Sequence, residues 1–304
     1  MNLTKITDLS ATDINEIFSI ADAIKAGRQK SKMDKKVLAL LFEKPSTRTR
    51  VSFEAAMARL GGSSIYIDKN TSQLSRGETI GDTAMVLSQY VDFIAARMYK
   101  QQDLENLASA STVPVINALT DMEHPCQAIS DIYTMREKSG TLKGKKLAFV
   151  GDIAANTANS LLAGCTAMGI DITLVGPKEC RPNAKYLSIA RKNGTVEVIA
   201  DMHHGIEKAD FIYTDTFVSM GQESEAEKRR AEFKNFQLNT RALLYAKKTA
   251  FIMHCLPAHR GEEITSDVLD GRQSAVWKQA ANKMPVEKAI LLYLYKSKRK
   301  DEGF

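Results

Sequence analysis

The segment Phe42–Arg50, FEKPSTRTR, carries a dense group of hydrogen-bond donors. It follows the apolar run KVLALL, and its proline marks the end of a strand and the start of a helix. The first N–H groups of a helix and the positive end of its dipole attract anions. Phosphate is the expected guest, because it offers several acceptor oxygens to the side chains of Ser46, Thr47, Arg48 and Thr49. An ordinary helix cap with solvated arginines is the alternative, and the P-loop pattern GxxxxGK[ST] is absent.

Polar side chains also follow other apolar runs in the first half of the chain. Arg97 ends the run DFIAAR, and His124 and Gln127 follow PVINAL in the segment EHPCQAISD. These groups are suited to polarising a ligand; a surface ion pair for Arg97 and a structural role for His124 are the alternatives. Metal binding by His124 and Cys126 is disfavoured, because no second pair of ligands has suitable spacing. Gln73 lies in the polar loop SQLSRGET, which could act as a lid or reach a neighbouring subunit.

The second half of the chain carries another set of polar residues. Asn156 lies in GDIAANTANS, which lacks the G-x-G-x-x-G pattern of a dinucleotide site. Asp215, in DTFVSMGQE, supplies a carboxylate suited to a ligand ammonium group, with a helix cap as the alternative. His254 and Cys255, in AFIMHCLP, raise the question of a cysteine nucleophile activated by a histidine. Covalent catalysis by Cys255 is disfavoured, because neighbouring residues of a strand point to opposite faces.

Short apolar runs alternate with helical patterns along most of the chain. Strands are predicted at 36–43, 63–68, 92–98, 114–119, 145–152, 171–177, 195–200, 210–217 and 250–257. Helices are predicted over STRTRVSFEAAMARL, at about 79–90 and 125–138, and at the end of the chain from PVEKAIL onward. Continuous apolar strands between helices indicate parallel sheets covered on both faces. We therefore predict two α/β domains that meet near the polar segment 137–146, with ligands bound in a crevice at the carboxyl ends of strands.

Composition excludes several classes of protein. The chain has 304 residues, of which 44% are hydrophobic and 26% charged, as in soluble proteins with domains of ~150 residues. The net charge of +6 arises partly from the tail KSKRK, and no basic patch with a nucleic-acid-reading motif accompanies it. The four cysteines are widely spaced, which indicates a reduced, intracellular protein. No signal-peptide pattern and no apolar run of ~18 residues is found, so we predict a cytoplasmic protein without a membrane span.

Five segments in this order, FEKPSTRTR, SQLSRGE, HPCQ, DTFVSMG and HCLPAHRG, make the chain similar to the ornithine carbamoyltransferases. The resemblance extends from about Leu9 to Leu294. The Ser-Thr-Arg-Thr-Arg and His-Pro-x-Gln turns are shared with aspartate carbamoyltransferases, whereas DxxxSMG and HCLP mark the ornithine branch. The resemblance implies transfer of the carbamoyl group from carbamoyl phosphate to the side-chain amine of L-ornithine, giving L-citrulline and phosphate, in arginine metabolism. It also implies direct attack, with no covalent enzyme intermediate and no metal or organic cofactor.

The resemblance further implies where each substrate binds. Carbamoyl phosphate would lie on a domain 1–138, onto which a final helix 285–304 packs, and ornithine on a domain 139–284, with the active site in the crevice between them. Carbamoyl phosphate would contact Ser46, Thr47, Arg48, Thr49, Gln73, Arg97, His124, Gln127, Cys255, Leu256 and Lys283. Ornithine would contact Asn156, Asp215, Ser219 and Met220. The implied catalytic residues are Arg48, Arg97, His124, Asp215 and Cys255. The implied assembly is a homotrimer or a multiple of trimers, with Gln73 on a loop that contributes to a site in the trimer.

Two departures from the family pattern leave alternatives open. The segment QAANK has Ala281 and Lys283 where the family usually has a glutamate and an arginine, and lysine lacks the bidentate fork of arginine. Of the asparagine pair that is usual in the family, Asn156 alone is present. One alternative is a related enzyme that acts on aspartate, putrescine or an acylated ornithine. The other is a protein that binds these ligands without turnover.

Overall fold

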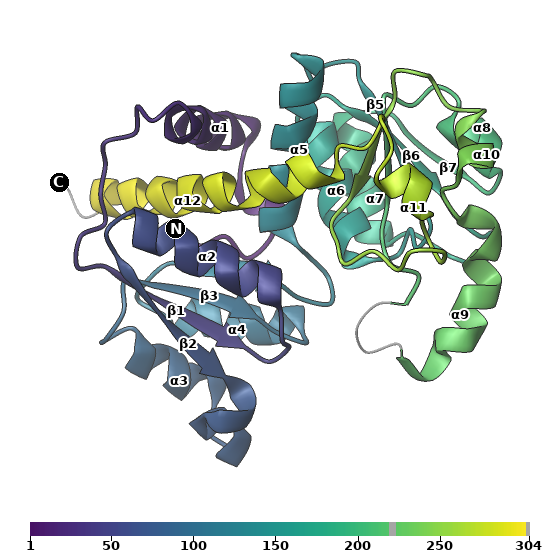
Figure 1. The fold of residues 1–304 in the computed structure, drawn as a ribbon. Coiled ribbons are helices and arrows are strands. Elements are labelled where there is room, and N and C mark those ends of the chain that lie inside the picture. Colours follow the sequence, from purple (N-terminus) through teal and green to yellow (C-terminus); the bar gives the residue numbers. More distant parts are fainter. Residues whose placement is uncertain (219–222, 302–304) are drawn as a thin grey trace. The chain divides into compact units, whose positions relative to one another are not determined.

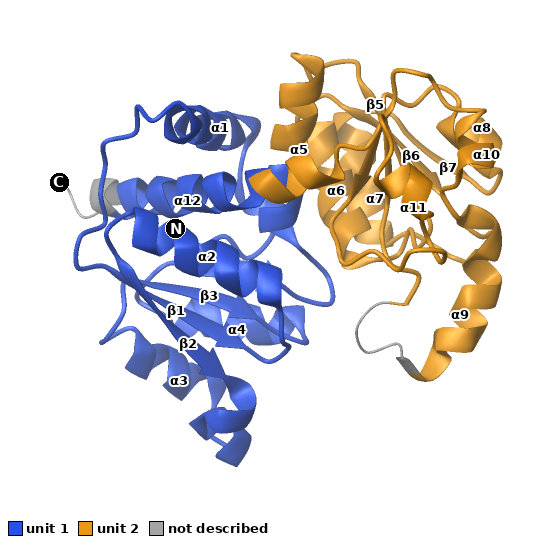
Figure 2. Cartoon of the chain, viewed as in Figure 1, with its two compact units in different colours: residues 1–130, 282–304 blue, residues 131–281 orange. Residues whose placement is uncertain are grey.

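The computed structural model of the chain describes residues 1–218 and 223–301, which divide into two compact units (Figure 2). Unit 1 comprises residues 1–130 and 282–304, and unit 2 comprises residues 131–281. The chain passes from unit 1 to unit 2 within helix α5 (Pro125–Ser139) and returns within helix α12 (Val276–Asp301). The domain limits predicted at 138/139 and 284/285 stay predictions.

In the described part of unit 1, four parallel strands form a sheet in the order β2-β1-β3-β4 (Figure 1). The strands predicted in the first half are confirmed, each with ends close to those expected: β1 (Val37–Phe42), β2 (Ser63–Asp68), β3 (Phe93–Arg97) and β4 (Val115–Leu119). In the register of the sheet, Phe42 is paired with both Asp68 and Arg97. The carboxyl ends of the first three strands are therefore level with one another.

Both faces of this sheet are covered, which is why its strands read as continuous apolar runs. Ala39 and Leu41 of β1 belong to a buried cluster with residues of α3 and α4. Leu38 and Leu40 are equally buried and point to the other face, on the side where α2 lies in Figure 1. The helices that begin and end within unit 1 are α1 (Ala11–Lys25), α2 (Thr47–Arg59), α3 (Ile80–Leu87) and α4 (Gln101–Ala110).

In the described part of unit 2, five parallel strands form a sheet in the order β7-β6-β5-β8-β9. They confirm the strands predicted in the second half: β5 (Lys146–Val150), β6 (Asp171–Val175), β7 (Val196–Ile199), β8 (Phe211–Thr214) and β9 (Phe251–His254). Strands β8 and β9 end before the predicted limits, so Asp215 and Cys255 each lie directly after a strand. The helices within unit 2 are α6 (Asn156–Ala167), α7 (Ala184–Asn193), α8 (Met202–Ile206), α9 (Ala226–Phe233), α10 (Thr240–Leu243) and α11 (Ser266–Leu269).

The last helix is longer than predicted. We expected it to begin at Pro285, but α12 begins at Val276 and contains Pro285 in its interior. A proline inside a helix removes one backbone hydrogen bond and costs about 3 kcal/mol. The misplaced start has a physical reason: the buried positions before the proline include Gln279 and Asn282, so the helical period there is not marked by apolar residues. In the part of the chain that the structure describes, neither α12 nor another helix is both long and apolar enough to cross a membrane.

Candidate functional site

The predicted phosphate turn lies after β1 and opens helix α2. Ser46 is the N-cap of α2, and its Oγ accepts a hydrogen bond from the Thr49 N–H at 3.4 Å. Thr49 is buried and Ser46 half-buried, whereas Thr47 and Arg48 are exposed. The other N–H groups of the first turn have no acceptor within the helix. The turn thus combines free donors, a positive helix end and an exposed cation, which together suit an anion.

The two arginines of this turn differ in their surroundings. Arg50 is held in place, because its Nε donates to Glu54 Oε1 at 2.9 Å and its guanidinium lies 3.8 Å from the ring centre of Tyr66. Arg48 is exposed and makes no hydrogen bond, ion pair or ring contact with the described residues. Arg48 is therefore the arginine that can give all its donors to a ligand.

The sheet register brings Arg97 close to this turn. Phe42, at the end of β1, is paired with Arg97, at the end of β3. On its other side Arg97 is paired with Leu119 of β4, after which the chain runs to His124. Helix α5 then begins at Pro125, as predicted. Arg97 is 5% exposed, so its guanidinium is a largely buried cation at the carboxyl edge of the sheet.

A buried, neutral imidazole lies among these cations. Burial lowers the pKa of His124 well below its ordinary value, and the positive charges of Lys283 and Arg97 lower the pKa further. Lys283 is itself buried, and its Nζ donates to Gln127 Oε1 at 3.1 Å. The structure therefore brings Arg97, His124, Gln127 and Lys283 together within unit 1. A neutral histidine beside two cations can donate a hydrogen bond to a carbonyl oxygen without giving up a proton.

Gln73 lies apart from this group, in the short 3₁₀ helix Gln73–Arg76 that follows β2. Its side chain is exposed and makes no hydrogen bond with a described residue. A loop of this kind is free to meet another molecule, but the predicted contribution of Gln73 to a site in a trimer stays a prediction.

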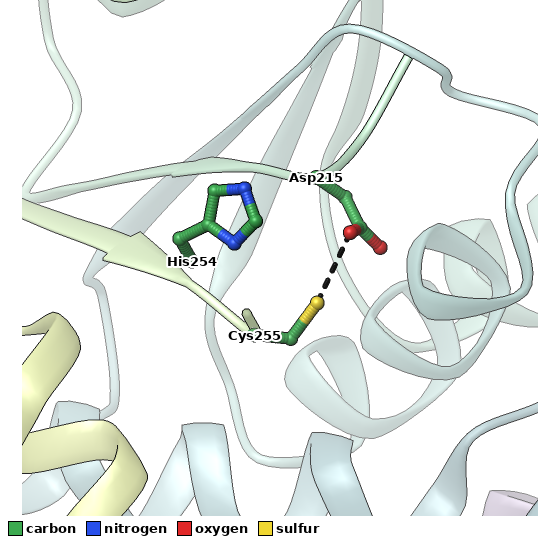
Figure 3. Close-up of side chains that lie close together, drawn as sticks. All are labelled: Asp215, His254 and Cys255. Carbon is green, nitrogen blue, oxygen red and sulfur yellow. Dashed lines mark hydrogen bonds between the residues drawn. The ribbon is translucent and has the colours of Figure 1, made fainter. Parts of the chain in front are cut away.

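In unit 2, Asp215 and Cys255 lie directly after the neighbouring strands β8 and β9 (Figure 3). The Cys255 Sγ donates to Asp215 Oδ1 at 3.1 Å, and the Thr216 N–H donates to the same oxygen at 2.8 Å. Burial and the Asp215 carboxylate raise the pKa of the Cys255 thiol well above its ordinary value. The thiol therefore keeps its proton, which argues against a thiolate nucleophile.

His254 lies nearer to Cys255 than the alternation of a strand would place it. A ring nitrogen of His254, the Cys255 sulfur and an Asp215 oxygen lie within 4.8 Å of one another, because β9 ends at His254 and its alternation stops there (Figure 3). Both ring nitrogens nevertheless have other partners: Nδ1 accepts from the Leu256 N–H at 2.8 Å, and Nε2 lies 3.1 Å from Glu263 Oε1. Because Nδ1 accepts, the proton is on Nε2 and points to Glu263. His254 thus cannot take the thiol proton in this arrangement.

The turn after His254 is held in an unusual backbone conformation. Leu256 has φ 61°, a left-handed value that costs a residue other than glycine about 1–3 kcal/mol. Its N–H is the group that donates to His254 Nδ1, so the locked imidazole supports the turn. This arrangement fixes the direction of the Leu256 backbone; the family resemblance implies that Leu256 contacts carbamoyl phosphate, which stays a prediction.

A buried polar network beneath β8 and β9 was missed by sequence reasoning. The Tyr213 hydroxyl donates to Asp131 Oδ2 at 2.8 Å, and Gln279 Nε2 donates to Asp131 Oδ1 at 2.7 Å. Gln279 Oε1 in turn accepts from the His254 N–H at 3.0 Å. All of these side chains are almost fully buried. The network therefore fixes the end of β9 from below, and with it the residue that precedes Cys255.

The remaining predicted ornithine contacts have different outcomes. Asn156 is the first residue of α6 and is half-buried, and its Oδ1 accepts from the Thr157 hydroxyl at 3.3 Å. It follows β5, which is the strand beside β8. Ser219 and Met220 lie outside the described residues. Arg229 forms an ion pair with Asp152 that was not predicted, and its Nε donates to the Phe217 carbonyl at 2.7 Å.

Two clusters of described residues bring potential metal ligands together: Asp215, His254 and Cys255, and His259, Glu262 and Glu263. In the first cluster both ring nitrogens of His254 already have partners, the Leu256 N–H and Glu263, whereas a metal needs a free imidazole nitrogen. In the second, Glu262 is paired with Arg230 at 3.0 Å, and Glu263 accepts from the His254 ring. We assign no metal to either cluster.

Comparison with known proteins matches both units. Residues 1–137 match the family described as "Aspartate/ornithine carbamoyltransferase, carbamoyl-P binding domain", and residues 143–294 match "Aspartate/ornithine carbamoyltransferase, Asp/Orn binding domain". The chain is 47% identical over 299 residues to "Ornithine carbamoyltransferase, anabolic" of Pyrococcus furiosus, covering 95% of both chains. It is 45% identical over 302 residues to the ornithine carbamoyltransferase of Bacillus subtilis, covering 97% of this chain and 94% of the relative. The solved structure of the Pyrococcus furiosus ornithine carbamoyltransferase superposes with a TM-score of 0.91, over 95% of both chains at 47% identity.

Proposed function

The chain belongs to the aspartate/ornithine carbamoyltransferase family, and we propose that it transfers the carbamoyl group of carbamoyl phosphate to the side-chain amine of L-ornithine. The products are L-citrulline and phosphate. The observation that carries the proposal is the group of buried cations around a neutral His124, next to an anion-binding helix start. The relative from Pyrococcus furiosus is named anabolic, which favours the direction of arginine biosynthesis for this chain too.

The carbamoyl phosphate half of the proposal uses residues of unit 1. Ser46, Thr47 and Thr49 at the start of α2 bind the phosphate oxygens, and Arg48 closes on them with its unoccupied guanidinium. Arg97 and His124 hold the carbamoyl oxygen, and Gln127 and Lys283 complete this set. The carbonyl oxygen and the leaving phosphate both become more negative in the transition state. In this assignment each of the two is bound by hydrogen-bond donors that stabilise that charge.

The ornithine half of the proposal uses residues of unit 2. Asp215 binds the α-ammonium group, and Asn156 holds a polar group of the same ligand. Cys255 keeps its proton and donates to Asp215, so it acts as a polar contact and not as a nucleophile. The Leu256 backbone, fixed by His254, offers a further contact to the carbamoyl group. Ser219 and Met220 belong to this half by their sequence motif alone.

The proposed step is a direct displacement. The neutral amine nitrogen attacks the carbamoyl carbon, a C–N bond forms, the C–O bond to phosphate breaks, and the amine proton passes to the departing phosphate. An ornithine amine has a pKa close to the ~10.4 of lysine, so the site must favour its neutral form. The cations that stabilise the leaving phosphate also disfavour a charged amine nearby. Positioning of the two substrates supplies much of the remaining acceleration.

Trimeric assembly and a cytoplasmic location are also part of this proposal. The exposed Gln73 loop is the feature of unit 1 that suits a contact with a second subunit. Light scattering of the purified protein gives its mass directly. A monomeric mass at catalytic concentrations would refute the trimeric part of the proposal and leave the assigned chemistry open.

One assay tests the reaction and its alternatives. Purified protein is mixed with carbamoyl phosphate and, in parallel, with ornithine, aspartate, putrescine or N-acetylornithine, and the ureido product is measured. We expect citrulline from ornithine and little product from the other amines. Product from another amine alone would indicate a related enzyme of different specificity. No product from any amine, in a protein that still binds carbamoyl phosphate, would indicate a binding protein without turnover.

A further inference from the structure

Lys283 and Glu287 form a buried ion pair one turn apart on α12. Lys283 Nζ lies 3.3 Å from Glu287 Oε1, and the two side chains are 8% and 0% exposed. Lys228 and Glu232 on α9 have the same residue types and spacing, with 73% and 43% of their side chains exposed and 3.8 Å between the charged atoms. The pair on α12 thus differs from the pair on α9 in being buried. An explanation is needed for why two charged side chains are buried at this place.

A buried ammonium group needs a nearby negative charge, because burial disfavours its charged form. The surroundings of Lys283 supply another cation instead, since Lys283 and Arg97 both lower the pKa of His124. The carboxylate of Glu287 offsets this excess of positive charge. Burial raises the pKa of Glu287, and the nearby Lys283 charge acts against that rise.

The contacts of Lys283 also define a direction. An ammonium group has three N–H donors. Among the described residues, Lys283 Nζ donates a hydrogen bond to Gln127 Oε1 at 3.1 Å and forms an ion pair with Glu287 Oε1 at 3.3 Å. Gln127 on α5 accepts a hydrogen bond from the group and the Glu287 carboxylate on α12 attracts its charge, so the two orient the group and leave N–H donors for a ligand. Without Glu287, Lys283 would lose its ion-pair partner and this orientation.

We propose that Glu287 is a positioning residue for carbamoyl phosphate binding, which balances the charge of Lys283 and holds its ammonium group in place for the ligand. The inference rests on the proposed function. Glu287 is fully buried and acts through Lys283, without touching the substrate itself. Nothing in the local sequence PVEKAIL sets this glutamate apart from an ordinary helical one.

The test compares Glu287→Gln with Glu232→Gln, which removes the matched exposed acid. Carbamoyl phosphate affinity is measured by calorimetry without ornithine, and both KM values are measured in the full assay. For Glu287→Gln we expect carbamoyl phosphate binding to weaken by about tenfold or more, because a buried cation loses its partner, while the KM for ornithine changes less than about twofold. Glu232→Gln should change neither, because exposed pairs contribute little. Unchanged carbamoyl phosphate affinity in Glu287→Gln would overturn the inference.

A second background separates positioning from a purely structural role. In Lys283→Met, the further change Glu287→Met should leave carbamoyl phosphate affinity unaltered, because the group that Glu287 positions is gone. If Glu287→Gln does not fold, the comparison of Lys283→Met with the double variant Lys283→Met/Glu287→Met is used as the test in its place, because an apolar pair can replace a buried ion pair. An additional loss of affinity in the double variant would show that Glu287 does not act through Lys283. A wild-type protein that binds carbamoyl phosphate but forms no ureido product would refute the proposed function and leave this binding test valid.

Discussion

Replacing Arg48 by alanine is the sharpest test of the phosphate turn. Arg48 is exposed at the start of α2 and has no partner among the described residues, so its removal breaks no internal contact there. A guanidinium that binds phosphate through two charge-assisted hydrogen bonds loses about 1.5–3 kcal/mol for each bond. The sum is about 3–6 kcal/mol, which corresponds to a fall of roughly 10²–10⁴ in kcat/KM.

Arg50→Ala is the matched control two residues along the same turn. Arg50 is engaged with Glu54 and with the ring of Tyr66. Its removal should therefore cost stability, by about 0.5–1.5 kcal/mol for an exposed ion pair and a cation–π contact together. We expect its kcat/KM to remain within about threefold of the wild-type value, because Arg50 has no donor directed to the ligand in our assignment.

The assay is steady-state citrulline formation with each substrate varied in turn, together with thermal unfolding of both variants. Arg48→Ala should unfold at the wild-type temperature and lose turnover. Equal activity of Arg48→Ala and wild type would refute the phosphate-cradle reasoning. A comparable loss in both variants would show that the turn acts through its conformation and not through the free guanidinium.

Three further predictions concern charge. Asp215→Ala should lower kcat/KM for ornithine by about 10- to 150-fold, the loss of a charged hydrogen bond, with the KM for carbamoyl phosphate unchanged in steady-state assays. The lowered pKa of His124 means that the unfolded chain binds the extra proton below pH ~6.5; stability is therefore retained above that pH and lost as pH falls through it, by about 1.4 kcal/mol at pH 5.5. Urea unfolding above pH ~6.5 and at pH 5.5 should show this difference in the free energy of unfolding for the wild type and no such difference for His124→Gln. The raised thiol pKa of Cys255, and that of Cys180 at about 12, predict alkylation by iodoacetamide at pH 8 that is slower than for free cysteine by about tenfold or more.

The order of elements was predictable because each strand is buried on both faces. Runs such as VLALLF and FIAAR are apolar without alternation, which is typical of a parallel sheet between helices. Where a run stops, the chain leaves the core, and the first polar residue after it lies at the carboxyl edge of the sheet. This reasoning placed Arg97 and Asp215 from sequence alone.

The supporting contacts were not predictable in the same way. Tyr213 reaches Asp131 across 82 residues of sequence, and Gln279 reaches the same carboxylate across 148. No period or local motif connects such partners. Gln279 also hid the true start of α12, because a polar residue at a buried position interrupts the apolar pattern on which helix prediction depends.

The base that takes the proton of the attacking amine is not supplied by Cys255 or His254. The amine must lose a proton, but the Cys255 thiol holds its own proton, and His254 has both ring nitrogens engaged. Neither group can therefore serve as the base in this arrangement. The departing phosphate is a suitable acceptor, since its second pKa of about 6 lies far above that of the N-protonated urea that forms when the C–N bond closes. In the mechanism that we propose, the donors of the α2 turn act twice: they stabilise the leaving group as the C–O bond breaks, and they hold it where it can take the proton that the new C–N bond makes acidic.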